Sequence, residues 1–487
     1  MPELSHRHRM LVLAICCMSL LIVSLDNTVL NVALPSMQKE LHASVAGLQW
    51  TIDAYTLVLA SLLMLAGSTA DRIGRRKVFV VGLIIFTSGS VLCSLAPNLD
   101  SLIAFRMMQA VGGSMLNPVA MSIITNTFTD PRERARAIGV WGGVVGISMA
   151  AGPLVGGLLV DSVGWRSIFW INLPVGLAAL LLTLRYVPES RAPKARRPDP
   201  VGQFLVIALL GSLTYAIIEA PSSGALKTLA FGVIAVAALL GLLRYEPRRA
   251  EPLIDLRFFR SAPFSGATVI AVSAFAALSG FLFLSTLYLQ NVRGLDALHA
   301  GLWMLPMAAM CFVCAPLSGR LVGSRGPRFS LLVAGIAMTA SGVLFAAFQA
   351  ETSNLTLVLG YVLFGLGFGF VNAPITNTAV SGMPRTQAGV AAAVASTSRQ
   401  IGGTLGVAVV GAVLASGVGA SAYRDTFVSA ARPGWWIIAG CGLAVLVLGA
   451  LTSGRWARGT AERTARELES GVVREKVGVQ TQDAPAA

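Results

Sequence analysis

Apolar runs of about 20 residues recur along most of this 487-residue chain and are separated only by short polar connections. At a helical rise of 1.5 Å per residue, about 20 residues cross the ~30 Å hydrocarbon core of a bilayer. Backbone groups in lipid must be paired within their own segment, which restricts such runs to helices. Only 12% of the residues are charged, against about 25% in soluble domains. The sequence therefore predicts an all-α integral membrane protein without a sizeable soluble domain.

Hydropathy and helix-breaking residues divide the chain into fourteen predicted spans. The spans cover residues 11–34, 46–66, 78–96, 101–126, 136–160, 168–186, 200–220, 226–244, 263–290, 298–318, 329–350, 355–380, 387–417 and 434–453. The first run is too long for the apolar core of a signal peptide and contains Asp26 and Asn27. We therefore expect it to be retained as a span.

The basic residues are distributed according to topology. Fourteen spans place all the arginine-rich connections on one side: residues 72–77, 132–136, 185–197, 244–260 and 320–328. The other side keeps only isolated bases: Lys39, Arg166, Lys227, Arg293, Arg424 and Arg432. By the positive-inside rule, both termini are expected in the cytoplasm of a bacterial cell, with the spans in its plasma membrane. The net charge of +14 forms no single patch, so no nucleic-acid partner is expected.

A short internal repeat indicates two related halves. Its residues are Gly67, Gly74 and Arg76 after span two, and Gly319, Gly326 and Arg328 after span ten. Parallel six-span repeats are a transporter architecture in which substrate binds between the halves near mid-membrane. The expected units are a cytoplasmic N-terminus (1–10), an N-terminal six-helix bundle (11–186), two linker helices with basic connections (187–262), a C-terminal six-helix bundle (263–453) and a cytoplasmic tail (454–487) that is disordered, at most after a short initial helix.

The connection between spans two and three reads GSTADRIGRRK over residues 67–77. A positive-inside loop explains its bases, but not Asp71 or the spacing of Gly67 and Gly74. The segment resembles the signature loop of the major facilitator superfamily. The resemblance implies that the acid caps a neighbouring helix and pairs with basic residues in one conformation, as a latch on the inner gate, and this role is carried over to Asp71 and Arg72. Gly67, Gly74 and Arg75 are expected in the same gate. The second copy has Gly323 in place of the acid, which implies a weaker latch or none there.

Five further segments resemble motifs of the fourteen-span drug:proton antiporters. They are residues 25–35 (LDNTVLNVALP), 50–57 (WTIDAYTL), 106–113 (RMMQAVGG), 146–157 (GISMAAGPLVGG) and 165–174 (WRSIFWINLP). Ala110 and Ser148 stand where that family has glycine. The resemblance implies a major facilitator fold of two six-helix bundles with two extra helices between them, and proton-coupled efflux.

The fifth span contains a glycine–proline segment whose physics can be read without the family. Glycines four residues apart, such as Gly152 and Gly156, allow helices to approach closely. Pro153 frees a backbone carbonyl and bends the helix. Such a helix suits a gate, and ordinary bundle packing is the alternative. In the resembled family, this segment is associated with export rather than uptake.

Three ionisable residues are expected at one depth inside the membrane. Counting at 1.5 Å per residue puts Asp26, Asp53 and Arg106 about 10 Å below the outer boundary. Charged groups at such depth are functional candidates because burying them is costly. We hypothesise that Asp26 or Asp53 exchanges a proton for substrate, and that Arg106 tunes the carboxylate. The alternative is a static ion pair that fixes the register of the helices.

Two further charges are weaker candidates for proton coupling or substrate contact. Arg399 lies well inside span thirteen and is expected to face the inward cavity or to counter an acid. Glu219 lies at the outer end of span seven, where an exposed edge carboxylate is the alternative. The six cysteines lie in apolar segments and the four histidines at or beyond span ends, so we expect no metal and no cofactor.

These features predict a monomeric antiporter that exports small lipophilic drugs or antibiotics by alternating access in exchange for protons. Acids without a matching set of buried bases favour cationic substrates. The nearest alternative is a dedicated exporter of one antibiotic or metabolite, followed by a proton-coupled importer. A membrane-embedded enzyme would need a convergent nucleophile and base or metal ligands, which the sequence does not show. No G-x-x-x-x-G-K-[ST] loop is present, so ATP drive is not expected.

Overall fold

The computed structural model describes residues 5–192, 199–249, 252–381, 383, 388–417 and 423–482, and this part of the chain is helical without strands. The helices are α1 (His6–Glu40), α2 (Val45–Ile73), α3 (Arg75–Ser94), α4 (Leu99–Thr127), α5 (Pro131–Ser162), α6 (Ser167–Trp170), α7 (Asn172–Tyr186), α8 (Pro200–Ile218), α9 (Ala225–Tyr245), α10 (Ala262–Leu287), α11 (Ala297–Arg325), α12 (Pro327–Ala346), α13 (Asn354–Val380), α14 (Ala388–Gly417), α15 (Tyr423–Thr452) and α16 (Arg455–Gln482). Short helical turns are η1 (Glu246–Arg248), η2 (Leu256–Arg260) and η3 (Tyr288–Val292).

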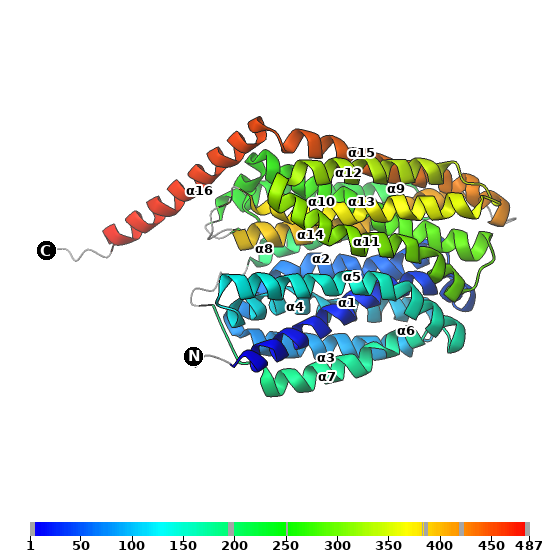
Figure 1. Cartoon of the computed structure of the whole chain (residues 1–487), viewed down its shortest axis with the longest axis horizontal. Coiled ribbons are helices and arrows are strands. Elements are labelled where there is room, and N and C mark those ends of the chain that lie inside the picture. Colours follow the sequence, from blue (N-terminus) through cyan, green and yellow to red (C-terminus); the bar gives the residue numbers. More distant parts are fainter. Residues whose placement is uncertain are drawn as a thin grey trace.

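Most of these helices are long, apolar and aligned side by side (Figure 1). Within the described ranges, twelve candidates are long and apolar enough to cross a membrane, and α5 adds a thirteenth if its two bent segments form one span. Helix α4 has 29 residues, a length of about 43 Å, but is not among these candidates. The all-α membrane fold is confirmed, and the count of fourteen spans is compatible with it.

Local sequence signals begin and end the helices. Ser44 and Asp296 accept hydrogen bonds from the first-turn N–H groups of α2 and α11, and Asn98 forms a capping box at α4. Gly74 and Gly326 end α2 and α11 with φ angles of 130° and 82°. These backbone conformations suit glycine, so the repeated glycines of the two copies mark the same turn.

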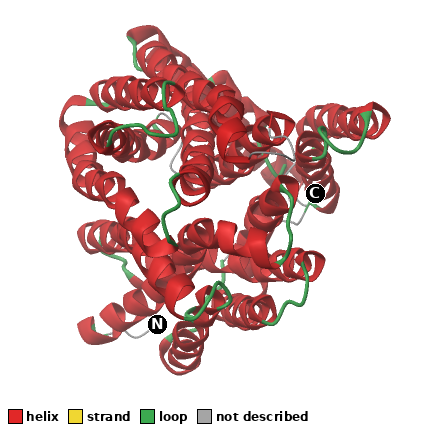
Figure 2. Cartoon of the chain, turned by 90° about the vertical axis from the view of Figure 1, so that its right-hand side faces the viewer, coloured by secondary structure: helices red, strands yellow, loops and turns green. Residues whose placement is uncertain are grey.

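The long helices form two groups. Helices α1 to α7 contact one another and form the first group, and helices α10 to α15 form the second. The hairpin of α8 and α9 packs through α8 against α2 and α14. Between the groups, the main contacts join α5 to α11 and α2 to α14, with smaller ones from α1 to α10. Figure 2 shows this arrangement along the helix axes.

Both marked termini lie at the same end of the bundle, which we call the terminal end; the opposite end is the far end (Figure 1). Helices α5 and α11 are closest at the far end, where a Cβ on Gly157 would lie 2.5 Å from the Leu298 Cα. Toward the terminal end, Cβ atoms on Gly139 and Gly143 of α5 would meet nothing within 4 Å. The two groups therefore close at the far end and separate toward the termini.

The C-terminal tail (454–487), in which at most a short initial helix is expected before a disordered end, contains one long helix. Helix α16 occupies Arg455–Gln482 and projects from the terminal end of the bundle (Figure 1). Ala457, Ala461 and Leu468 on this helix are buried, and α16 contacts α10 and η2. The small and apolar side chains recur at helical spacing, which supports packing although the segment is polar overall. Residues 483–487 lie outside the described part of the chain.

Candidate functional site

Asp26 of α1 and Arg106 of α4 form an ion pair inside the first group. The Arg106 side chain is fully buried, and that of Asp26 is 2% exposed. Arg106 Nη1 donates to Asp26 Oδ2. Because an isolated charge at this depth is costly, each residue makes the burial of the other tolerable.

Two amides complete the hydrogen bonding of the pair. Gln109 Nε2 and Asn172 Nδ2 each donate to Asp26 Oδ1 over 2.9 Å. Arg106 Nη1 also donates to Gln109 Oε1 over 2.7 Å, and Arg106 Nε donates to the Thr51 carbonyl over 3.3 Å. Helices α1, α2, α4 and α7 are thereby joined at one point. A buried polar network of this kind fixes the relative positions of its helices.

An aromatic side chain lies against the cation. The Arg106 guanidinium carbon is 4.1 Å from the centre of the Tyr55 ring, within the range of a cation–π contact. We call these residues the Asp26–Arg106 network: Asp26, Tyr55, Arg106, Gln109 and Asn172. The sequence analysis singled out only the two charges. The other three residues, Tyr55, Gln109 and Asn172, lie inside the family-like segments 50–57, 106–113 and 165–174, which was the only sequence signal for them. Gln109 also follows Arg106 by three residues and therefore shares its helix face.

Asp53 of α2 does not join this network. It is fully buried, and within the described part of the chain its carboxyl oxygens have no ion-pair partner and no donor in hydrogen-bond geometry; the Thr56 side chain is the polar group that interacts with it. Asp53 precedes Tyr55 by two residues, which turns the two side chains about 200° apart on the helix. Of the three charges expected at one depth, the structure brings Asp26 and Arg106 together and places Asp53 on another face of α2.

The face of α2 that carries Asp53 packs against α14 of the second group. Gln49, four residues before Asp53, donates to the carbonyl oxygens of Val407 and Ala408 over 3.1 and 2.8 Å. Thr56, three residues after Asp53, accepts a hydrogen bond from Thr404 over 2.8 Å. Positions separated by three and four residues share a helix face. Asp53 therefore lies at the boundary between the two groups, in the half that is closed.

Arg399 of α14 belongs to the second group. Its Nη2 donates to the Thr376 hydroxyl of α13, and its guanidinium carbon lies 5.9 Å from the centre of the Phe275 ring. It has no acidic partner among the residues that the structure describes. Arg399 is thus a cation held by a hydroxyl and an aromatic ring, away from the Asp26–Arg106 network.

Glu219 ends α8 and is half-buried. Its Oε1 accepts a hydrogen bond from Trp50 Nε1 over 2.9 Å, and its Oε2 accepts one from Ser222 over 2.7 Å. The carboxylate therefore ties the hairpin of α8 and α9 to the start of α2. The structure places it apart from the other buried charges, at the far end.

The signature loop is folded within the first group. Arg75 donates to Asp71 Oδ1 through Nε and Nη2, over 3.0 and 2.9 Å. The backbone of the same turn donates to Glu189 and Ser190, which follow α7. Arg72 is exposed, and Gly67 lies near Pro118 of α4. At the terminal end, no hydrogen bond or ion pair joins this loop to the described residues of the second group, in keeping with the separation there.

The glycine–proline segment packs α5 against two helices at once. A Cβ on Gly152 would lie 2.0 Å from Thr28 Oγ1 of α1, and one on Gly156 would lie 3.0 Å from Val29. On the other side, a Cβ on Gly301 of α11 would lie 2.2 Å from the Pro153 carbonyl oxygen. Helix α5 bends by 41° between its segments Arg132–Met149 and Ala151–Ser162. The bend lies where a proline at 153 leaves the carbonyl four residues earlier unpaired.

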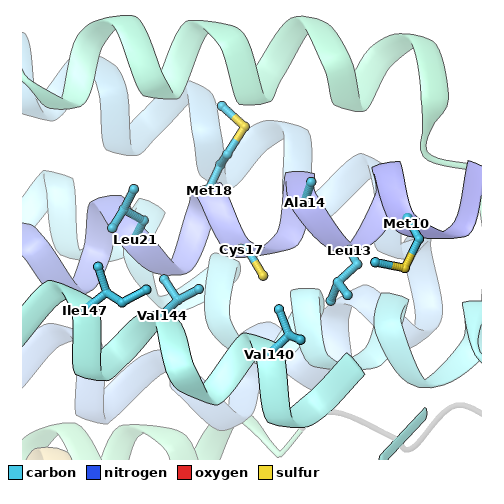
Figure 3. A pocket seen from close by; sticks show the side chains of 9 residues that line it. All are labelled: Met10, Leu13, Ala14, Cys17, Met18, Leu21, Val140, Val144 and Ile147. Atoms are coloured by element: carbon cyan, nitrogen blue, oxygen red, sulfur yellow. The ribbon is translucent and has the colours of Figure 1, made fainter. Parts of the chain in front are cut away.

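An apolar cavity of about 400 Å³ lies between α1 and α5 in the terminal half (Figure 3). It is lined by Met10, Leu13, Ala14, Cys17, Met18, Leu21, Val140, Val144 and Ile147. All nine side chains are apolar or weakly polar, and two are flexible methionines. Such a wall accepts lipophilic groups of varied shape.

The chain matches the family model of the Major Facilitator Superfamily over residues 16–407. It is 38% identical over 418 residues to the multidrug resistance protein Stp of Mycobacterium tuberculosis, covering 85% of this chain and 78% of that protein. It is 39% identical over 417 residues to the tetracenomycin C resistance and export protein of Streptomyces glaucescens, covering 85% and 77%.

Among solved structures, the chain is similar to a bacterial homolog of the human lysosomal transporter Spinster in an inward-facing, occupied conformation. The TM-score is 0.64 at 19% identity, over 94% of this chain and 98% of that one. The helical architecture and the matched family model agree. The chain belongs to the major facilitator superfamily, with relatives that are multidrug and antibiotic efflux proteins.

Proposed function

We propose that this protein exports small lipophilic compounds in exchange for protons, by alternating access between its two groups of helices. The observation that carries the proposal is Asp53, a carboxyl group buried at the closed boundary between the groups without a charged partner among the described residues. The relatives named for drug resistance and export support efflux.

The environment of Asp53 links its protonation to the closure of the far end. An ionised carboxylate without a partner is too costly to bury, so the group is neutral while α2 and α14 are in contact there. Substrate binding from the terminal end displaces the Asp53 proton toward that end, and the far end then opens with Asp53 ionised and exposed to water. After the substrate leaves, Asp53 takes up a proton from the far side, which allows the far end to close again. A proton thus moves toward the terminal end as the substrate moves toward the far end.

The Asp26–Arg106 network has a different role in this scheme. Asp26 accepts one hydrogen bond from the Arg106 guanidinium and two from the Gln109 and Asn172 amides. It therefore holds the helices of the first group together while α2 moves against α14. We assign the transported proton to Asp53, and to Asp26 the role of the partner that makes the burial of Arg106 tolerable.

The orientation follows from the basic connections. The α2–α3 turn with Arg72, Arg75 and Arg76 lies at the end of the bundle that also holds both termini. Cytoplasmic loops carry the excess of Lys and Arg. We therefore place the terminal end in the cytoplasm and the far end outside the plasma membrane, which makes this structure an inward-facing state of an exporter.

The substrate preference follows from the cavity. Its apolar wall favours lipophilic compounds. Two candidate charges beyond the ion pair have no oppositely charged partner among the described residues: the acid Asp53 and the base Arg399. Asp53 supports a preference for cationic substrates, and Arg399 opposes that preference. A growth-inhibition panel with cationic and anionic drugs, comparing cells with and without the protein, would measure this preference and its breadth.

The decisive test uses inverted membrane vesicles, in which the proposed cytoplasmic face is outside. Adding substrate should release protons from the vesicles that contain the parent protein. Asp53→Asn should abolish this movement while leaving substrate binding intact. Asp26→Asn should weaken the fold and binding together. Normal proton movement in Asp53→Asn would refute the assignment, and movement of substrate in the opposite direction would favour an importer.

A further inference from the structure

Asp161, in the last turn of α5, bonds to the first turn of a helix in the other group. Asp161 Oδ1 accepts from the backbone N–H of Ala297 over 3.2 Å, and Oδ2 accepts from that of Leu298 over 2.7 Å. Helix α11 begins at Ala297. A carboxylate of the first group therefore caps a helix of the second group.

The first N–H groups of a helix have no partner within the helix and carry a positive partial charge. At α11, two carboxylates divide these groups between them. Asp296, which belongs to the second group, accepts from the third N–H, that of His299, over 2.7 Å. The first and second N–H groups are left to Asp161. The α11 cap is thus complete only while the two groups are in contact.

The packing next to Asp161 shows that this contact requires the closed far end. One turn before Asp161, a Cβ on Gly157 would lie 2.5 Å from the Leu298 Cα and 2.7 Å from the Ala297 carbonyl oxygen. The backbones of α5 and α11 therefore touch here with no side chain between them. Any opening of the far end that separates these backbones also removes Asp161 from the N–H groups of Ala297 and Leu298.

Other charged groups surround this contact. Asp296 interacts with the Asp161 side chain, and the His299 ring lies 2.7 Å from both Asp296 oxygens. The backbone N–H of His299, followed by its side chain, lowers the pKa of Asp296. Asp296 is therefore ionised across the ordinary pH range and already has partners within its own group. Asp161, in contrast, accepts hydrogen bonds from N–H groups of the other group of helices.

We propose that Asp161 is the latch of the far-end gate: its carboxylate stabilises the closed far end by capping α11 across the boundary between the groups. The inference rests on the alternating access of the proposed function, but not on the identity of the proton carrier. Loss of the charge removes the stabilisation from the closed state only. The equilibrium then shifts toward the state that is open at the far end.

The test measures the width of the far end directly. Spin labels at Lys39, in the last turn of α1, and Glu351, between α12 and α13, would report on the two groups by double electron–electron resonance. Both positions are exposed, and the native cysteines would be replaced in this background. Asp161→Asn should raise the ratio of long to short distances by about fivefold, as expected for a charge at a helix terminus.

Asp296→Asn is the matched control, because it removes a carboxylate from the same helix terminus while the bonds from the Ala297 and Leu298 N–H groups to Asp161 remain. It should not raise the population of long distances. An unchanged ratio in Asp161→Asn, or an equal rise in both variants, would overturn the latch. Asp161→Ser, which keeps a shorter uncharged acceptor, provides a second variant if the asparagine protein folds poorly. A parent protein that shows one distance under all conditions would instead contradict alternating access itself.

Discussion

The hydroxyl of Thr404 on α14 donates a 2.8 Å hydrogen bond to the hydroxyl of Thr56 on α2. This bond crosses the boundary between the two groups less than one helical turn from Asp53. Gln49 makes two further bonds to the α14 backbone one turn toward the far end. Gln49, Thr56 and Thr404 thus form a polar contact between α2 and α14 next to the buried carboxyl group, which we call the α2–α14 seam. A substitution can disturb this seam without removing a charge.

Gly411→Ala should loosen this seam. A Cβ at 411 would lie 2.5 Å from Gln49 Cδ, and Gln49 cannot move away without losing its bonds to Val407 and Ala408. We expect a shift toward the far-end-open state in the distance measurement with labels at Lys39 and Glu351. Gly402→Ala is the control, because its Cβ would meet Val272 within the second group. A shift caused equally by both variants would show that general loosening of α14 is responsible.

Because Asp26 and Arg106 form a buried ion pair, single and double variants of the pair should differ in their free energy of unfolding. Arg106→Met leaves the Asp26 carboxylate without its counter-ion and should lower the free energy of unfolding by about 3–5 kcal/mol. The double variant Asp26→Asn with Arg106→Met removes both charges and should recover much of that loss. Reversible unfolding in detergent would measure both. A double variant that is as unstable as the sum of its singles would show that the two residues act independently.

Gly152→Ala should impair the protein by steric overlap, because its Cβ would lie 2.0 Å from Thr28 Oγ1 and 2.5 Å from Thr28 Cβ. Overpacking of this kind costs about 1–3 kcal/mol. Gly139→Ala on the same helix is the matched control, since nothing lies within 4 Å of its Cβ. We expect the melting temperature and the export rate to fall for Gly152→Ala and to stay near the parent values for Gly139→Ala. Equal losses would show that α5 needs glycine flexibility rather than space.

The sequence analysis predicted the fold class and the family because both depend on patterns that repeat along the chain. It also placed Asp26 and Arg106 at one level, where the structure pairs them, since a span of known direction converts residue number into position along the helix axis. Depth is only one coordinate, however. The direction in which the Asp53 side chain points from α2 depends on which neighbouring helix packs on each face. Asp53 therefore lies apart from Arg106, although all three charges were expected at one level.

Other features had no separate signal in the sequence. Asp161 is an ordinary polar residue at the end of a span until α11 is placed beside it, because its partners are backbone N–H groups far along the chain. The polar composition of the tail indicated at most a short helix, whereas the longer α16 packs through a few buried small side chains such as Ala457 and Ala461. Contacts between distant segments are set by tertiary packing, which local patterns do not contain.

Arg399 should influence which charge the exported compound carries. It lies between α13 and α10 with Thr376 and Phe275 as partners, and no acid neutralises it among the described residues. A cation in this position disfavours cationic compounds and stabilises anionic or carbonyl-rich ones. Arg399→Gln should therefore improve export of a cationic dye relative to an anionic dye of similar size, while Arg399→Lys should keep the parent ratio. Uptake of both dyes by inverted vesicles would measure the ratio in one preparation. An equal loss for both dyes in Arg399→Gln would assign the residue to the helix contacts of α13 and α14 rather than to the substrate.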